Sequence, residues 1–360
     1  MSSGKIRVGF IGLNPDSQWA FKSHLPALQL LSDDFEITGV ANSTPESARR
    51  TATALHIPHA FNNPQALIQS PEVDLVVVTV KVPHHFELVK AALEAGKHVY
   101  CEHPLGNGLE ETQQLATLAK NQRVVAVIGT QMVVAPAVRY LAQLIKEGYV
   151  GKVLSTTLIG SGGNWGSVTV ANNYYLFDKA NGATMLTIPL GHTLAGLTAV
   201  LGGFAQLTAQ LTSNFTMVKV QDTTETKPKT AADQILVQGT LASGAAISIH
   251  YRGGVSRGTN LLWEINGTEG DIQVTGPLGH GQLTPLTIRG ARGDEKELTP
   301  LVPPAALYSG LPDNPVVGNV AQLYKLLAAD IRNNTCTAPS FADALVLHQL
   351  LDSIEQSAQG

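Results

Sequence analysis

The sequence predicts an α/β protein: an N-terminal Rossmann doubly wound parallel sheet, followed by a C-terminal α/β domain with a large open, mainly antiparallel sheet. Apolar strand-like runs alternate with helix-like stretches over residues 4–130. Beyond residue 130, short alternating runs joined by Gly and Asn turns are typical of antiparallel strands. The length of 360 residues also exceeds the usual size of a single core. We therefore expect two domains, residues 4–130 and residues 131–360.

Composition narrows the class of protein. The chain is 44% hydrophobic and 14% charged, which describes an ordinary globular interior. Its net charge is −4 and no basic cluster stands out, so we expect no direct nucleic-acid partner. Cys101 and Cys336 lie far apart, which indicates free thiols in a reducing compartment. The chain shows no apolar signal core and no run of about 18 apolar residues, so we expect a cytoplasmic soluble protein without a membrane partner.

The first strand, residues 6–12, leads into a loop that starts at Gly12. In the dinucleotide fingerprint G-x-G-x-x-G, two further glycines let the backbone approach a pyrophosphate and let the helix pack on the strand. Here those positions hold Asn14, which tolerates left-handed backbone, and Ser17, which can cap the next helix. The candidate cofactor-binding residues of this loop are Gly12, Leu13, Asn14 and Trp19.

A helix over about residues 20–31 and a strand over residues 35–41 complete a right-handed crossover unit. The end of that second strand normally reads the adenosine ribose, with an acid for NAD and neutral or basic groups for NADP. Asn42 and Ser43 occupy this place, and Arg49 follows a turn into the next helix. Because no carboxylate would repel a 2′-phosphate, the sequence favours NADP(H) over NAD(H). The alternative is that Arg49 and its neighbour Arg50 are solvated helix charges.

The alternating pattern continues to residue 130. Residues 74–80 form an unbroken apolar run, typical of a strand buried on both faces, and Thr79 near its end is a candidate cofactor contact. The remaining predicted elements are helices 44–55, 86–95 and 109–120 and strands 98–101 and 124–129.

The segment Lys97–Gly106 joins an apolar strand to Pro104. The residue before a proline is restricted to extended geometry, so His103 should leave the sheet at its carboxyl edge. Ligands bind at that edge of an open parallel sheet. His103 is therefore either a ligand-facing imidazole or simply a polar loop residue.

The second half predicts a different architecture. We expect helices over about 136–148, 182–201, 315–332 and 342–358, and strands over 153–160, 205–215, 234–241, 245–251, 261–266, 271–275 and 283–288. The polar tract 221–231 is expected to be a mobile surface loop. Because a large open sheet must cover its exposed face, we expect a homodimer or a higher homo-oligomer.

Several segments resemble the glucose-fructose oxidoreductase, inositol dehydrogenase and MocA family. They are Ala91–Val99 followed by Cys101-Glu102-x-Pro104, Leu144–Gly151 at the end of a domain-joining helix, and Gly191-His192. His85 lies where that family often has histidine. Further segments, among them Val237–Leu241 and Ile265–Asp271, resemble the branch that contains the fungal galactose-regulon repressor and its oxidoreductase-like relatives. The resemblance implies a nicotinamide dinucleotide bound to the first domain, with Thr79, His85, Glu102, Pro104 and Gln131 among its contacts.

The chain departs from the family pattern at three places. His103 replaces the lysine that contacts substrate and nicotinamide, and Ile188 replaces the aspartate four residues before the catalytic histidine, with Thr187 the nearest polar group. The arginine expected near Gln131 is also missing.

Hydride transfer to or from a carbinol carbon needs a group that exchanges the hydroxyl proton, and His192 is the candidate. An unperturbed imidazole has a pKa of about 6.5, which suits proton transfer in either direction at neutral pH, and His103 would assist His192. Alternatively, His192 is a satisfied core histidine. The candidate substrate-binding residues, each with a packing or surface role as the alternative, are Asn164, Trp165, Tyr175, Asp178 and Thr187.

No metal is predicted, because the remaining histidines form no ligand set. The first interpretation is an NAD(P)-dependent oxidoreductase acting on a hydroxyl or carbonyl of a sugar, cyclitol or related small polar compound. The alternative is a non-catalytic, dinucleotide-binding transcriptional regulator like the repressor of the same branch.

Overall fold

The computed structural model describes residues 4–16 and 19–359 and shows two compact units. The first unit holds the described residues up to Thr130 together with Leu311–His348. The second holds Gln131–Gly310 and the described residues from Gln349 onward. The expected boundary at residue 130 coincides with a unit boundary, but a C-terminal segment also joins the first unit. Ser17, the expected helix cap, lies outside the described residues.

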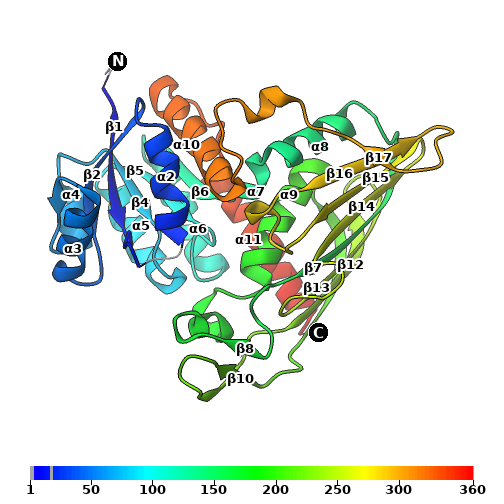
Figure 1. Ribbon diagram of the computed structural model, residues 1–360, viewed down its shortest axis with the longest axis horizontal. Helices are drawn as coiled ribbons and strands as arrows, with labels where there is room; N and C mark the ends of the chain where they lie inside the picture. Colours follow the sequence, from blue (N-terminus) through cyan, green and yellow to red (C-terminus); the bar gives the residue numbers. More distant parts are fainter. Residues whose placement is uncertain (1–3, 17–18, 360) are drawn as a thin grey trace. The chain divides into compact units, whose positions relative to one another are not determined.

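A parallel sheet with the strand order β3-β2-β1-β4-β5-β6 forms the centre of the first unit (Figure 1). Its strands are β1 (Ile6–Ile11), β2 (Phe35–Ala41), β3 (His59–Ala60), β4 (Leu75–Val78), β5 (His98–Glu102) and β6 (Ala126–Gly129). The helices between them are α1 (Trp19–Lys22), α2 (His24–Leu30), α3 (Pro45–Leu55), α4 (Pro64–Gln69), α5 (His85–Glu94) and α6 (Leu109–Asn121). The predicted Rossmann architecture is confirmed.

Local sequence explains these elements. All four residues of β4 are buried, as its unbroken apolar run predicted. Helix α3 begins where the Thr44 side chain accepts a hydrogen bond from the Ser47 N–H, with Pro45 as first helical residue. The helix ends at His56, whose backbone is left-handed with φ 55°. Strand β3 and helix α4 were not predicted, because both are short.

The C-terminal segment completes the core of the first unit. Helix α10 (Pro315–Asn333) lies beside α2 (Figure 1). Phe341 and Ala344, in the first part of α11 (Phe341–Ser357), belong to the same buried apolar cluster as Ile128 of β6. Sequence position alone therefore does not define the first unit.

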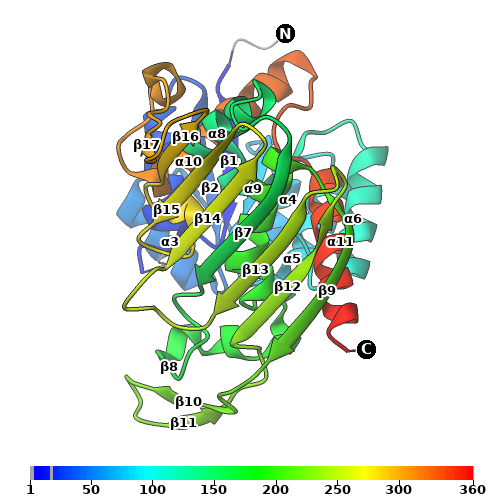
Figure 2. The same cartoon turned by 90° about the vertical axis from the view of Figure 1, so that its right-hand side faces the viewer.

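An eight-stranded sheet with the order β17-β16-β15-β14-β7-β13-β12-β9 dominates the second unit. Only the β7–β13 pair in this sheet is parallel, which confirms the predicted mainly antiparallel sheet. Figure 2 shows one face of the sheet with no helix in front of it. The strands are β7 (Val153–Ser161), β9 (Phe204–Thr212), β12 (Gln234–Leu241), β13 (Ala246–Arg252), β14 (Leu261–Gly267), β15 (Gly270–Gly276), β16 (Thr287–Arg292) and β17 (Thr299–Pro300). Helices α7 (Gln131–Val134), α8 (Pro136–Lys146) and α9 (Gly191–Leu201) complete the unit.

The prediction of a mobile loop over 221–231 was wrong. Strands β10 (Met217–Val220) and β11 (Thr226–Pro228) form an antiparallel hairpin there, and β10 also pairs with β8 (Val168–Thr169). The hairpin is anchored by Lys229, whose buried ammonium lies 2.8 Å from a carboxylate oxygen of Asp233. The polar composition suggested a loop because this neutralising contact is invisible in local sequence.

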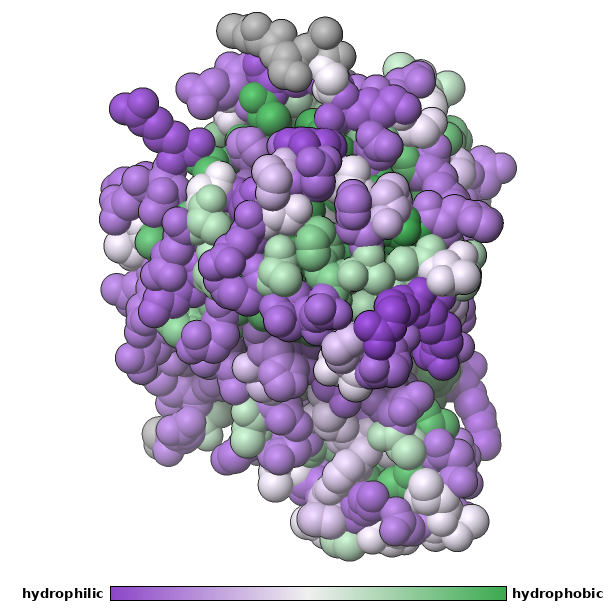
Figure 3. All heavy atoms as spheres, turned by 90° about the vertical axis from the view of Figure 1, so that its left-hand side faces the viewer, coloured by the Kyte–Doolittle hydropathy of each residue, from purple (hydrophilic) through white to green (hydrophobic). Residues whose placement is uncertain are grey.

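The face shown in Figure 3 is mostly hydrophilic, with apolar side chains scattered among the polar ones. Within the described part of the chain, no helix has the length and apolar character needed to cross a bilayer.

Candidate functional site

Gly12 lies at the point where the strand order reverses, because β1 is flanked by β2 on one side and β4 on the other. Its φ is +104°, and a Cβ there would lie 2.8 Å from the Val80 side chain and 3.1 Å from the Thr79 carbonyl carbon. Only glycine fits this close approach. Leu13 next to it is fully buried, and the Thr79 N–H donates to the Ile11 carbonyl at 3.0 Å. The structure thus brings Gly12, Leu13 and Thr79 together at a carboxyl edge suited to a dinucleotide.

In the loop after Gly12, Asn14 takes the place of the second glycine of the dinucleotide fingerprint and forms side-chain hydrogen bonds. The Asn14 side-chain oxygen accepts the Asp16 N–H at 3.0 Å, and its amide group donates to the Ser47 hydroxyl at 3.4 Å. Left-handed backbone was anticipated at Asn14, but it is not among the positive-φ residues of the described chain. A side-chain turn therefore shapes this loop.

Asn42 forms the second part of the same region. Its amide group donates to Ser47 at 3.3 Å and to Thr51 at 3.1 Å, so Ser47 links Asn14 and Asn42. The Asn42 side-chain oxygen is buried and has no hydrogen-bond partner among the described residues. A buried, unsatisfied acceptor costs free energy unless a ligand supplies a donor. Together with the Gly12 loop, this acceptor fits an adenosine ribose.

The arginines expected beside this region form ion pairs on the surface. Arg49 lies 2.6 Å from Glu46, and Arg50 lies 2.8 Å from Asp16. Both guanidinium groups are more than half exposed, and Ser43 is exposed as well. A 2′-phosphate would therefore have to compete with Glu46 for the Arg49 guanidinium.

The end of β5 carries a buried polar network that sequence reasoning missed. His24 lies between the Glu102 carboxylate, 2.9 Å from Nε2, and the Tyr324 hydroxyl, 2.8 Å from Nδ1. Trp19 packs edge-on against His24 at a centroid distance of 6.3 Å, and its buried indole N–H has no partner in the described structure. Tyr324 lies 300 residues from His24 in the chain, so no local signal could have indicated the contact.

His103 follows β5 directly and precedes Pro104 through a cis peptide bond. Its ring lies edge-on to that of His348 on α11, with centroids 5.9 Å apart. Burial lowers the pKa of His348 to about 4, so this second ring is neutral at physiological pH. An imidazole near His103 was not predicted.

His85 contacts the backbone of the loop that contains His103 and Pro104. Its Nδ1 lies 2.8 Å from the Pro104 carbonyl oxygen and its Nε2 lies 2.9 Å from the Val80 carbonyl oxygen. The backbone carbonyls of Val80 and Pro104 thus occupy both ring nitrogens of His85, which gives this side chain a role in holding the loop. Cys101 is buried beside it, and burial raises the pKa of the thiol well above its usual range.

His192 stands near the start of α9 in the second unit and is buried. A single π-helical turn, Leu186–Leu190, precedes it and contains Ile188 and Pro189. The next residue, Thr193, lies 2.7 Å from the Tyr251 hydroxyl, which in turn donates to the Gly279 carbonyl at 2.8 Å. Since π turns recur at functional sites, this segment is a reasonable location for a proton carrier.

The predicted substrate residues of the second unit make specific local contacts. Trp165 is buried with φ 62°, and its indole donates to the Leu176 carbonyl at 2.8 Å. The Asn164 carbonyl accepts from Gly254, and the Tyr175 carbonyl accepts from Asn181. Exposed Asp178 caps a short turn through the Ala180 N–H, and the Thr187 hydroxyl donates to the Gly182 carbonyl at 2.6 Å. Trp165 and Thr187 thus have clear packing or turn roles.

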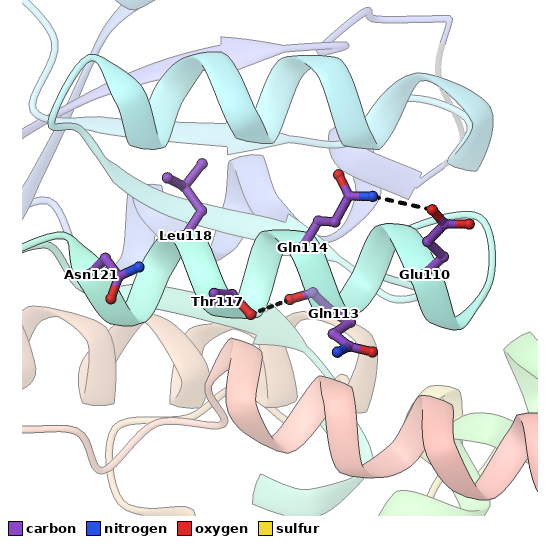
Figure 4. A pocket seen from close by; sticks show the side chains of 6 residues that line it. All are labelled: Glu110, Gln113, Gln114, Thr117, Leu118 and Asn121. Atoms are coloured by element: carbon purple, nitrogen blue, oxygen red, sulfur yellow. Dashed lines mark hydrogen bonds between the residues drawn. The ribbon is translucent and has the colours of Figure 1, made fainter.

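Gln131 and a hollow on α6 remain to be placed. Gln131, predicted to contact the cofactor, is buried in the short helix α7. A hollow on α6 is lined by side chains that hydrogen-bond to the same helix, including Gln114 to Glu110 and the Thr117 hydroxyl to the Gln113 carbonyl (Figure 4). Among the residues described by the structure, no three His, Cys, Asp or Glu side chains could hold a metal ion.

Comparison with known proteins identifies the family. Residues 6–130 match the Gfo/Idh/MocA oxidoreductase family with an NAD-binding Rossmann fold, and residues 136–276 match the C-terminal domain of Gal80p. The dehydrogenase aclE of Aspergillus oryzae is 32% identical, with 76% of this chain and 78% of that protein covered. The chain belongs to the Gfo/Idh/MocA family.

Within the Gfo/Idh/MocA family, this chain is similar to Gal80 proteins in both sequence and structure. The galactose/lactose metabolism regulatory protein GAL80 of Kluyveromyces lactis is 31% identical over 80% of this chain and 67% of its own length. A crystal structure of Gal80p from Saccharomyces cerevisiae superposes with a TM-score of 0.90 at 27% identity, covering 99% of this chain and 96% of that one. The relatives of this chain therefore include both a protein named as a dehydrogenase and a protein named as a regulator.

Proposed function

We propose that this protein is an NAD(H)-dependent oxidoreductase that transfers a hydride between the nicotinamide and a hydroxyl or carbonyl of a sugar, cyclitol or similar compound. The observation that carries the proposal is the Gly12 loop at the point of strand reversal, where a Cβ would collide with Thr79 and Val80. A match to a family described as NAD-binding supports the cofactor. The relatives named as dehydrogenases of levoglucosan and myo-inositol support the class of substrate.

The residues of the chain would divide the work as follows. The first unit would hold the dinucleotide through the loop that starts at Gly12, with Asn42 at the ribose. When bound, the nicotinamide supplies the hydride acceptor or donor. His192 would exchange the proton of the substrate hydroxyl, and His103 would hold the oxygen by a hydrogen bond.

We also propose NAD(H), in place of the NADP(H) that the sequence favoured. The buried Asn42 oxygen is an acceptor, which suits a ribose hydroxyl and repels a phosphate. Arg49 and Arg50 would have to leave Glu46 and Asp16 to bind a 2′-phosphate.

Two measurements test the function. Calorimetric titration with NAD⁺ and NADP⁺ should show binding, tighter for NAD⁺. Absorbance of the reduced cofactor should then change with at least one member of a panel of sugars, inositols and keto-sugars.

His192→Ala should lower kcat by about 10²–10⁴-fold and leave cofactor affinity intact, whereas His59→Ala, a change at an exposed histidine of β3, should alter neither. Unchanged turnover in His192→Ala would remove the assigned proton carrier.

A second candidate function is a non-catalytic, dinucleotide-binding regulator. Two specific observations favour it: His103 and Ile188 replace a lysine and an aspartate expected of the enzymes, and the branch includes proteins named as Gal80 regulators. Tight NAD⁺ binding without turnover of any panel compound would favour the regulator over the enzyme.

A further inference from the structure

The network at the end of β5 holds a carboxylate in a fixed position. His24 is fully buried, with Nε2 2.9 Å from an oxygen of Glu102 and Nδ1 2.8 Å from the Tyr324 hydroxyl. The Glu102 side chain remains 12% exposed, so a ligand can still reach it. Tyr324 therefore lies on one side of the His24 ring, and the Glu102 carboxylate, at the carboxyl end of β5, lies on the other.

The direction of each hydrogen bond follows from the chemistry of the three groups. An ionised carboxylate can only accept, so the His24 Nε2–H must donate to Glu102. Burial, followed by the Glu102 charge, raises the pKa of the Tyr324 phenol well above its usual value, so its O–H stays protonated and is available to donate to a His24 Nδ1 that carries no hydrogen. The tautomer of His24 with its hydrogen on Nε2 thus satisfies both partners, because it donates to the Glu102 carboxylate and accepts from the Tyr324 hydroxyl.

Aromatic packing prevents the imidazole from turning away. The Tyr100 ring lies edge-on to His24 at 5.0 Å and stacks on Tyr324 at 5.0 Å. Phe10 closes a further side, edge-on at 6.1 Å. In such apolar surroundings a charge acts more strongly on a nearby ligand than the same charge in water.

Glu102 lies at the carboxyl end of β5, on the side of the strand reversal opposite to Asn42. A dinucleotide that spans the reversal and places its ribose at Asn42 brings its nicotinamide half to the β4–β5 side. The oxidised nicotinamide ring carries a positive charge, and the reduced ring is neutral. A fixed carboxylate at that edge therefore attracts one redox state more than the other.

We propose that the Tyr324–His24–Glu102 network makes the cofactor site selective for the oxidised dinucleotide, with Glu102 as the charged group and His24 and Tyr324 as positioning residues. This inference rests on the proposed binding of NAD(H) by the first unit. It concerns the relative affinity for the two redox states and requires no turnover.

Equilibrium binding of NAD⁺ and NADH to the full-length protein tests the proposal. The wild type should bind NAD⁺ in preference to NADH. Glu102→Gln, which keeps the shape and removes the charge, should raise Kd for NAD⁺ relative to Kd for NADH by about fivefold. Tyr324→Phe, which removes only the hydroxyl behind His24, should shift the same ratio by about twofold in the same direction.

Glu36→Gln is the matched control, because it removes an exposed carboxylate near the amino end of β2 and should leave the ratio unchanged. Thermal unfolding of each variant shows whether it is folded. If Glu102→Gln binds both forms with the wild-type ratio, the selectivity is not due to this network and the inference fails alone. If the wild type binds neither form, the proposed function fails and the inference with it.

Discussion

Histidines in the first unit show how surroundings decide what one type of side chain does. The ring nitrogens of His24 meet a carboxylate and a phenol, and those of His85 meet two backbone carbonyls. The Nε2 of His348 is buried and has no hydrogen-bond partner among the described residues. Of these three described histidines, His348 is the one with an unsatisfied buried ring nitrogen, and it should be sensitive to acid.

The burial of His348 predicts that the free energy of unfolding depends on pH. Its pKa in the folded protein is about 4, below the value of about 6.5 in an unfolded chain, because burial disfavours the charged ring. Its contribution is full above pH 6.5 and falls as the pH drops toward 4, by roughly 3 kcal/mol in all. His348→Phe should lose less stability between pH 7 and pH 5 in urea unfolding than the wild type. Equal losses in the two proteins would contradict this account.

The predictability of site residues depended on where their partners lie in the chain. Gly12, Asn42, Glu102 and His103 all stand at strand ends. Open parallel sheets bind ligands at this edge, so the order of elements alone predicts these residues. Ser47 and Thr51 look like ordinary residues of α3, although they hold the Asn42 amide. The partners of His24 and His103 on α10 and α11 are distant in sequence, and only folding brings them there.

At the scale of elements, regular helices and strands were predictable because their apolar periodicity is local. Strand β2 and strand β12 have the predicted bounds, and most other elements differ by a few residues. The predicted helix over 182–201 instead starts with turns and a π-helical turn around Pro189 before α9. The tract 221–231, which holds β11, was mistaken for a loop because the anchor of its hairpin is a buried ion pair.

That anchor gives a prediction for Lys229 and Asp233, whose side chains are both fully buried. Although burial opposes ionisation, hydrogen bonds from Lys229 and from two backbone N–H groups lower the pKa of Asp233. Lys229→Met leaves this carboxylate without its counter-ion and should cost about 3–5 kcal/mol of unfolding free energy.

The control is Lys227→Met, two residues earlier, which removes an exposed pair with Glu225 at 2.9 Å and should cost less than about 1 kcal/mol. Denaturant titration of both variants measures the difference. Similar losses for the two lysines would show that the buried pair does not anchor the hairpin.

At the scale of the whole molecule, the open face of the eight-stranded sheet supports the expected homo-oligomer (Figure 2). Cross-strand register aligns a row of side chains on this face, with Leu236 42% exposed. The row runs through Leu236, His250, Ile159 and Leu262. We propose that a second copy of the chain covers this row.

Light scattering after size-exclusion chromatography should give the mass of a dimer or larger assembly. Leu236→Asp should shift it toward the monomer, because a desolvated carboxylate opposes association. Val302→Asp, at an exposed valine outside the sheet, should leave the mass unchanged. A monomeric wild type would contradict the proposed interface.

The C-terminal segment of the first unit has a consequence for biosynthesis. Strands β1 to β6 leave the ribosome first, yet Tyr324, Phe341 and Ala344, which complete their network and core, are made only after the last strand of the second sheet. Domains generally fold as units during synthesis, starting from the amino end. Here the first unit must wait for translation to pass residue 348, so its nascent strands remain incomplete while the whole second sheet is being synthesised.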